Sequence, residues 1–81
     1  MSKKTRKLAS IKPREALRVL ERAGWFIHRT IGSHVHLKHY QKPGRITVPY
    51  HAGFDLPKGT IKRIINQAGL TNEEFLDLLG K

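Results

Sequence analysis

Three short stretches between residues 25 and 49 constrain the fold of this chain more than any other feature. The first, "WFIHRT" (residues 25–30), is aromatic and β-branched, the second, "HVHLKHY" (34–40), alternates apolar and polar residues, and the third, "RITVP" (45–49), is again β-branched. Each pattern is typical of a β-strand. Because the connections "IGS" and "QKPG" are only a few residues long, consecutive strands can pair only as antiparallel neighbours.

Helical patterns flank the three strands. In "SIKPREALRVLERAG" (residues 10–24), Pro13 suits a first helical turn, apolar residues recur at three- and four-residue spacing, and a glycine ends the pattern. A second helix is predicted over residues 59–68, and Thr71 with Glu74 forms a capping-box pattern that predicts a last, short helix. The order helix, three strands, helix, short helix predicts an α+β fold with the helices on one face of an antiparallel sheet.

Charge is distributed unevenly along the 81 residues. Residues 1–50 contain twelve Lys and Arg against two Glu, whereas residues 51–81 contain four basic and four acidic residues, and the net charge of the chain is +10. A strongly basic half indicates a surface for a polyanion, with nucleic acid as the first candidate. We expect residues 1–9 to be a basic flexible tail and residues 10–81 to form one small domain.

Composition excludes several classes of protein. The chain has no cysteine, so it has neither disulfides nor cysteine-based zinc or redox sites. No apolar run approaches the roughly 20 residues of a membrane span, and the basic start "MSKKTRKLAS" is not followed by the apolar core of a secretory signal. We therefore expect a cytoplasmic protein with no membrane partner.

Side chains alternate along a strand, which divides the residues of "HVHLKHY" between two faces. Val35 and Leu37 are expected to turn inward, toward the helices, and Ile46 and Val48 of the third strand should join them. The opposite face then carries His34, His36, Lys38, Arg45 and Thr47. By the same parity His39 lies on the inner side, near the strand end, as a structural residue.

The first strand has two possible orientations. Either Trp25 and Ile27 or Phe26 and His28 would face the helices, and both pairs are suited to burial. Spacing alone does not choose between them.

The clustered histidines admit three interpretations. As metal ligands, His34 and His36 would share one strand face. A third ligand would have to be His51 or Asp55, and no other metal-binding motif is present, so we expect no metal cofactor. As a proton-transfer residue a histidine needs no cofactor, because it titrates near neutral pH and RNA carries its own nucleophile, the 2′-hydroxyl. In the third interpretation the histidines are surface strand residues without a chemical role.

His34 is the first candidate for proton transfer. It directly follows Gly32 and Ser33, and a tight glycine turn lets a phosphate approach the backbone closely. His36 competes by the same logic. The candidate RNA contacts on this face are Gly32, Ser33, His36, Lys38 and Arg45.

The whole pattern resembles the HicA (YcfA-like) toxins, which are small mRNA interferases of prokaryotic toxin–antitoxin pairs. The resemblance covers about residues 12–79 and rests on "KPREALRVLERAGW", "GSH" at 32–34, "ITVPYH" at 46–51, "LPKGTIKRIINQAGLT" at 56–71 and "EEFLDLL" at 73–79. It implies a double-stranded-RNA-binding-domain-like fold, a catalytic role for His34, and a HicB-type antitoxin that covers the active face.

We therefore expect the toxin of a type II toxin–antitoxin system, a metal-independent endoribonuclease that cleaves mRNA. A non-catalytic RNA-binding module of the same fold is the main alternative, because it would have the same charge. A helix-turn-helix DNA-binding protein is disfavoured, because its reading helix would carry Glu73, Glu74 and Asp77 toward the phosphates.

Overall fold

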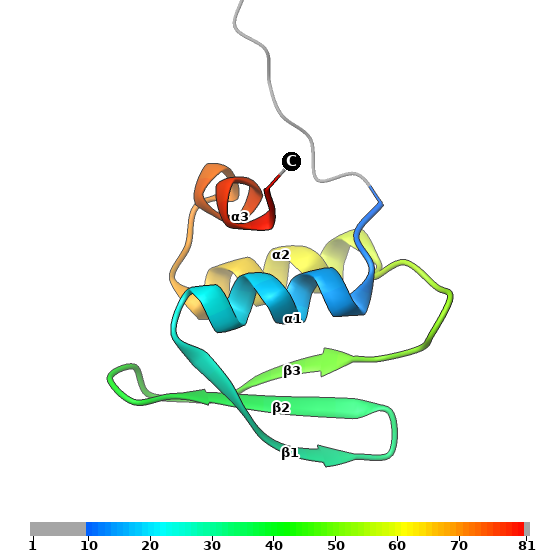
Figure 1. The fold of residues 1–81 in the computed structure, drawn as a ribbon, viewed down its shortest axis with the longest axis horizontal. Coiled ribbons are helices and arrows are strands. Elements are labelled where there is room, and N and C mark those ends of the chain that lie inside the picture. The colour runs from blue at the N-terminus through cyan, green and yellow to red at the C-terminus, as the bar shows by residue number, and fades with distance from the viewer. Residues whose placement is uncertain (1–9, 81) are drawn as a thin grey trace, which may run out of the picture.

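A computed structural model describes residues 10–80, and the tail predicted at residues 1–9 lies outside the described residues, as does residue 81. The elements in chain order are α1 (Pro13–Arg22), β1 (Trp25–Ile31), β2 (His34–His39), β3 (Ile46–Pro49), α2 (Lys58–Ala68) and α3 (Asn72–Leu79) (Figure 1). The three strands and α2 lie within about one residue of the ranges predicted from the sequence, and α1 lies inside the predicted range of residues 10–24.

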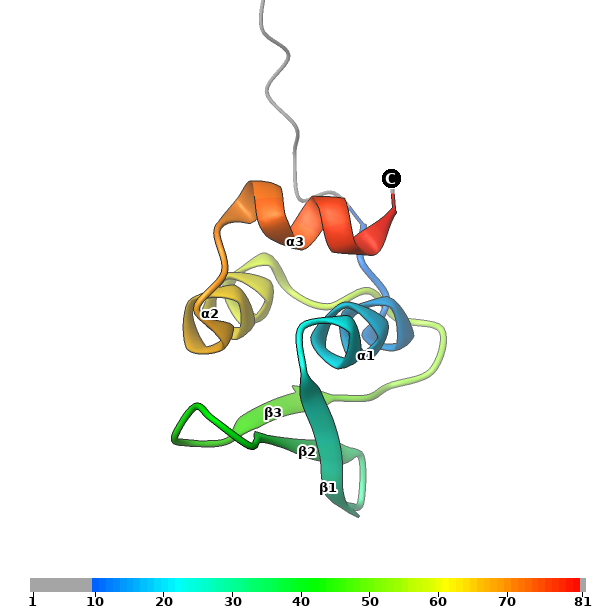
Figure 2. The same ribbon diagram turned by 60° about the vertical axis from the view of Figure 1, so that its left-hand side comes forward.

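The three strands form one antiparallel sheet in the order β1-β2-β3. The helices α1 and α2 cover one face of this sheet, and α3 lies across the far side of these two helices (Figure 1, Figure 2). This arrangement confirms the predicted α+β, double-stranded-RNA-binding-domain-like fold with a short C-terminal helix. Within residues 10–80, no helix is long and apolar enough to cross a membrane.

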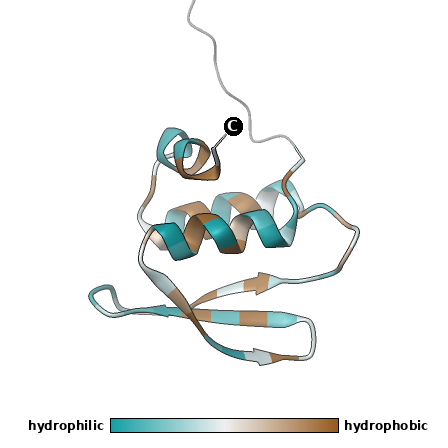
Figure 3. Ribbon diagram, in the orientation of Figure 1, coloured by the Kyte–Doolittle hydropathy of each residue, from teal (hydrophilic) through white to brown (hydrophobic). Residues whose placement is uncertain are grey.

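The central strand β2 separates a buried face from an open one, and its hydrophobic and hydrophilic residues alternate (Figure 3). Val35 and Leu37 are 6% and 0% exposed. The strand register places them opposite Val48 and Ile46, which are both fully buried. The predicted inward direction of these four side chains is confirmed, and it fixes the outward direction of the residues between them.

The core fills the space between the sheet and the helices and continues up to α3. The helices contribute to it Ala16, Val19, Leu20, Ile61, Ile64, Ile65, Ala68, Phe75, Leu76 and Leu79. In each helix these residues recur at three- and four-residue spacing, so one stripe is buried and the remaining surface is left to charged residues.

Side-chain caps determine where α1 and α3 begin. Pro13 is the first residue of α1, and the Glu15 carboxylate accepts a hydrogen bond from the Lys12 backbone N–H at 2.9 Å. At α3 the predicted capping box is confirmed, because Thr71 Oγ1 accepts from the Glu74 N–H at 3.0 Å and the Glu74 carboxylate accepts from the Thr71 N–H at 2.8 Å.

Two long basic side chains connect elements that are distant in the sequence. Arg22, at the end of α1, donates to the Leu78 carbonyl of α3. Lys42, in the β2–β3 connection, donates to the Ala68 carbonyl at the end of α2 at 2.8 Å. Both cations meet the carbonyl end of a helix, where positive charge is favourable.

The orientation of β1, which the sequence left open, is mixed. Trp25 is buried at 2% exposure, whereas Ile27 is 45% exposed. The register with β2 shifts between Ile27 and Arg29, so His28 is the extra residue of a bulge, and it is exposed. A bulge changes the face of every residue after it, and neither of the two pairs considered from the sequence is buried as a pair.

Candidate functional site

The sheet face that points away from α1 and α2, called the outer face below, is polar and basic. Across β1 and β2, Arg29 pairs with His36 and Ile31 pairs with His34, and Thr47 of β3 pairs with His36. The side chains that the register assigns to the outer face are Phe26, Arg29, Ile31, His34, His36, Lys38, Thr47 and Pro49. The predicted outward positions of His34, His36 and Lys38 are therefore confirmed.

A two-residue turn of Gly32 and Ser33 joins β1 to β2. Gly32 has a φ of 58°, and no non-glycine residue in the range 10–80 has a positive φ. This sign pattern is that of a type II′ hairpin turn, which favours glycine at its first position. No heavy atom lies within 4 Å of the point where a Cβ on Gly32 would stand, so the backbone of the turn is open to a ligand.

His34 is the first residue of β2, directly after this turn, and its side chain is exposed. It lies opposite Ile31 on one side and Pro49 on the other. The Ser33 carbonyl accepts a hydrogen bond from the Tyr50 N–H at 2.6 Å, which fixes the turn against the chain that follows β3. The His34 ring forms no hydrogen bond with another residue between 10 and 80. Both ring nitrogens are thus available to a substrate.

His36 has a different environment from His34. It is half-buried, and its Nδ1 lies 2.9 Å from Thr47 Oγ1. Burial is the first cause that lowers the pKa of His36 below its ordinary 6.5, and the second is positive charge nearby, from Arg45, His34, Arg29 and His28. The neutral form of His36 is therefore favoured, and the Thr47 hydroxyl restricts its ring orientation.

The charges that act on His36 identify which of the predicted residues the fold brings near it. His34 and Arg45 are among these charges, and Lys38 is not. Lys38 instead lies opposite Phe26, toward the other end of the outer face.

Two further members of the group were missed in the sequence. His28 and Arg29 reach the surroundings of His36 because the bulge in β1 turns the strand onto the outer face after Ile27. The only signal in the sequence was a run of three polar residues, His28, Arg29 and Thr30, in an otherwise apolar strand. We refer to His28, Arg29, His34, His36 and Arg45 as the His/Arg cluster.

The two residues considered as a third metal ligand lie elsewhere. His51 is exposed in the connection after β3, and Asp55 forms an ion pair with Lys12 at 2.9 Å. The hydrogen bond from Lys12 is the main cause that lowers the pKa of Asp55, and a further hydrogen bond from Ser10 adds to it, while burial opposes both. Within the described residues, no three His, Asp or Glu side chains are placed to hold one metal ion.

His39 has the structural role that its inner position predicted. Its Nδ1 accepts hydrogen bonds from the backbone N–H groups of Gln41 and Lys42 at 3.0 and 3.2 Å, and its Nε2 lies 3.3 Å from the Ala23 carbonyl. The edge of the ring packs against Trp25 with centroids 5.1 Å apart. These contacts join the end of β2 to the end of α1. Because they occupy both ring nitrogens of His39, neither nitrogen is available to a substrate.

Comparison with known proteins identifies the family of this chain. A family model described as "HicA toxin of bacterial toxin-antitoxin" matches residues 13–70, which is more than two thirds of the chain. The chain belongs to the HicA toxin family. The matched range runs from the start of α1 through all three strands to the end of α2, so it contains the whole outer face. Among curated proteins no match was found.

Membership confirms the resemblance found in the sequence. As a HicA toxin, the chain is the toxin of a toxin–antitoxin system, and its partner in that system is an antitoxin. The helix-turn-helix alternative is not supported, because the residues assigned to its two helices form α2 and α3 of the toxin fold and bury their apolar side chains in the core.

Proposed function

We propose that this HicA toxin is an endoribonuclease that cleaves mRNA, with His34 as the proton-transfer residue. The observation that carries this proposal is the exposed imidazole of His34, which forms no hydrogen bond with residues 10–80 and lies directly after the open Gly32–Ser33 turn, on the same face as the rest of the His/Arg cluster. A histidine of this kind can exchange protons with a substrate at neutral pH, and the neighbouring arginines can hold a phosphate beside it.

The proposed reaction uses the nucleophile that RNA itself provides. His34 removes the proton of a ribose 2′-hydroxyl, and the resulting oxygen attacks the adjacent phosphorus. The bond from phosphorus to the 5′-oxygen breaks, and that oxygen takes up a proton from the protonated imidazole or from water. The products are a 2′,3′-cyclic phosphate on one fragment and a 5′-hydroxyl on the other.

The rest of the cluster is suited to stabilising charge rather than to moving protons. Arg29 and Arg45 are permanent cations that can neutralise the charge developing on the phosphate oxygens. His36 is a weaker candidate for proton transfer than His34, because it is half-buried and one of its ring nitrogens contacts Thr47. We therefore assign Gly32 and Ser33 to shaping the turn, and His36 and Arg45 to binding RNA near it. Lys38 is assigned to RNA binding farther along the strand.

The experiment that tests this proposal is cleavage of a purified RNA by wild-type protein and by His34→Gln. Loss of a general acid–base residue typically lowers the rate by about 10²–10⁴, and because the side chain is exposed, the thermal unfolding curve should not change. In His34→Ala, free imidazole added to the buffer should restore part of the activity. A folded His34→Gln protein that cleaves at the wild-type rate would disprove the assignment. RNA that is shifted on a gel but never shortened by the wild-type protein would favour the non-catalytic RNA-binding module.

We further propose that a HicB-type antitoxin binds the outer face. Charge supports this, since the cluster is cationic, and so does the exposure of apolar side chains there, because Ile31 is 55% exposed and Tyr40 is 88% exposed. The Tyr40 ring also stacks on Phe26, with centroids 4.7 Å apart. A partner that presents carboxylates and aromatic side chains would complement this surface.

A further inference from the structure

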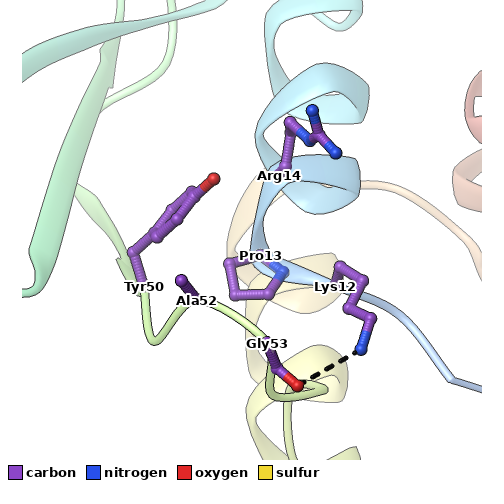
Figure 4. A pocket seen from close by; sticks show the side chains of 6 residues that line it. All are labelled: Lys12, Pro13, Arg14, Tyr50, Ala52 and Gly53. Atoms are coloured by element: carbon purple, nitrogen blue, oxygen red, sulfur yellow. Dashed lines mark hydrogen bonds between the residues drawn. The ribbon is translucent and has the colours of Figure 1, made fainter.

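A pocket opens between the start of α1 and the chain that follows β3. Its volume is about 310 Å³, and its lining residues are Lys12, Pro13, Arg14, Tyr50, Ala52 and Gly53. Figure 4 shows Tyr50 and Ala52 on one side, Pro13 and Arg14 on the other, and a hydrogen bond from Lys12 Nζ to the Gly53 carbonyl that closes one end. A volume near 300 Å³ is at the lower end of the range for small-ligand sites.

The polar groups of this pocket differ in how they are occupied. Lys12 already forms an ion pair with Asp55 at 2.9 Å and contacts the Gly53 carbonyl at 3.5 Å, so it serves to hold the walls together. Neither the Arg14 guanidinium nor the Tyr50 hydroxyl forms a hydrogen bond or ion pair with any residue from 10 to 80. The Arg14 guanidinium and the Tyr50 ring with its hydroxyl are therefore available to a ligand in the pocket, as far as residues 10–80 are concerned.

The pocket lies at the same end of the sheet as the proposed catalytic turn. Tyr50, which lines it, is the residue whose backbone N–H bonds to the Ser33 carbonyl at 2.6 Å, and the preceding residue, Pro49, lies opposite His34. The pocket lies beside α1, whereas His34 lies on the outer face, so an RNA strand with one phosphate at His34 would reach the pocket by passing around this end of the sheet.

We infer that this pocket binds one nucleotide of the RNA substrate beside the cleavage site, with its base against the Tyr50 ring and its phosphate on Arg14. The inference rests on the proposed function, because it takes the scissile phosphate to lie at His34. The chemistry of the lining fits a nucleotide: a guanidinium pairs with a phosphate through two parallel N–H groups, and an aromatic ring accepts any base by stacking. Such a subsite fixes the position of the strand relative to His34.

The test uses the full chain and an RNA whose cut site has been mapped. Cleavage is measured with the unmodified RNA. Binding is measured with the same RNA carrying a 2′-O-methyl ribose at the cut site, so that it is not cleaved. The variants are Arg14→Gln, Tyr50→Leu and Tyr50→Phe. The matched control is Arg18→Gln, which removes an exposed arginine one turn farther along α1 that does not line the pocket. Thermal unfolding of each variant checks the fold, which matters most at Tyr50 because this residue also packs against the core.

We expect Arg14→Gln to weaken RNA binding by about tenfold and to raise KM with little change in kcat, since a binding contact is lost. The slope of log affinity against log salt should become shallower by about 0.7, the value for one phosphate of a single strand. Tyr50→Leu should weaken binding by at least about fivefold through lost stacking, whereas Tyr50→Phe should keep most of it. Arg18→Gln should bind within twofold of wild type.

The remaining outcomes separate this inference from the proposed function. If wild type cleaves RNA and His34→Gln does not, but Arg14→Gln and Tyr50→Leu bind RNA as Arg18→Gln does, the pocket inference is wrong and the proposed function stands. If wild type does not cleave RNA, both fall. If Arg14→Gln leaves RNA binding unchanged and instead weakens the complex with the antitoxin, the pocket binds a carboxylate of that partner and the nucleotide assignment is wrong.

Discussion

Gly32 determines the path of the backbone into His34. Its φ of 58° lies in the left-handed region, which costs a residue with a side chain about 1 kcal/mol. We predict that Gly32→Ala lowers the free energy of unfolding by about this amount and slows cleavage, since the turn must relax. The control is Gly59→Ala in α2, where φ is ordinary and no atom stands near the new Cβ, so stability should rise slightly. Urea unfolding compares the two, and an equal effect would contradict the role given to the turn.

His36 should make the stability of the toxin depend on pH. Because its pKa is lowered in the folded chain, the unfolded chain binds a proton at higher pH than the folded chain does. The free energy of unfolding should therefore fall as the pH drops from about 6.5 toward the lowered pKa, and should be unaffected by this group well above 6.5. We predict that the free energy of unfolding of His36→Gln depends less on pH in this range than that of the wild type. An NMR titration that puts the His36 midpoint at or above 6.5 would contradict this.

The face on which each residue of β2 lies could be predicted from the sequence alone. β2 pairs with β1 on one side and with β3 on the other. A one-residue slip in its register would therefore expose Val35 and Leu37 and bury His36. The edge strand β1 has no such constraint on its outer side, and a bulge after Ile27 reverses the alternation there. Arg29 was therefore missed, although it belongs to the His/Arg cluster.

The pocket beside the turn could not be predicted at the level of elements. Its two walls come from residues 12–14 and 50–53, which belong to different elements and have no shared pattern. They are joined by the hydrogen bond from Lys12 to the Gly53 carbonyl, and Lys12 also pairs with Asp55, which the sequence suggested only as a metal ligand. Long-range contacts made by single side chains leave no periodicity in a sequence, whereas buried stripes do.

The connection between β2 and β3 is held to α2 by one lysine. Lys42 Nζ donates to the Ala68 carbonyl at 2.8 Å, at the end of the helix where a cation is favourable. We predict that Lys42→Met lowers the free energy of unfolding by about 1 kcal/mol and increases hydrogen exchange in residues 40–45. Lys62→Met, which removes an exposed lysine of α2, is the control and should have little effect. Equal stability of the two variants would show that the contact does not hold the connection.

We have proposed that the antitoxin covers the outer face. This face combines the cationic cluster with exposed Ile31 and the stacked rings of Phe26 and Tyr40. We predict that complex formation protects residues 32–38 from hydrogen exchange, and that higher salt slows association because charge steers the encounter. Inhibition of the toxin with this segment still fully exchangeable would mean that the antitoxin acts from another surface.

The chemistry assigned to His34 is tested most directly by the ends of the RNA fragments. If the 2′-hydroxyl is the nucleophile, one fragment must carry a 2′,3′-cyclic phosphate and the other a 5′-hydroxyl. EDTA should leave the rate unchanged, and a 2′-O-methyl group at the cut site should block cleavage there. Fragments with a 5′-phosphate, or activity that EDTA removes and a divalent ion restores, would contradict proton transfer by His34 as the basis of cleavage.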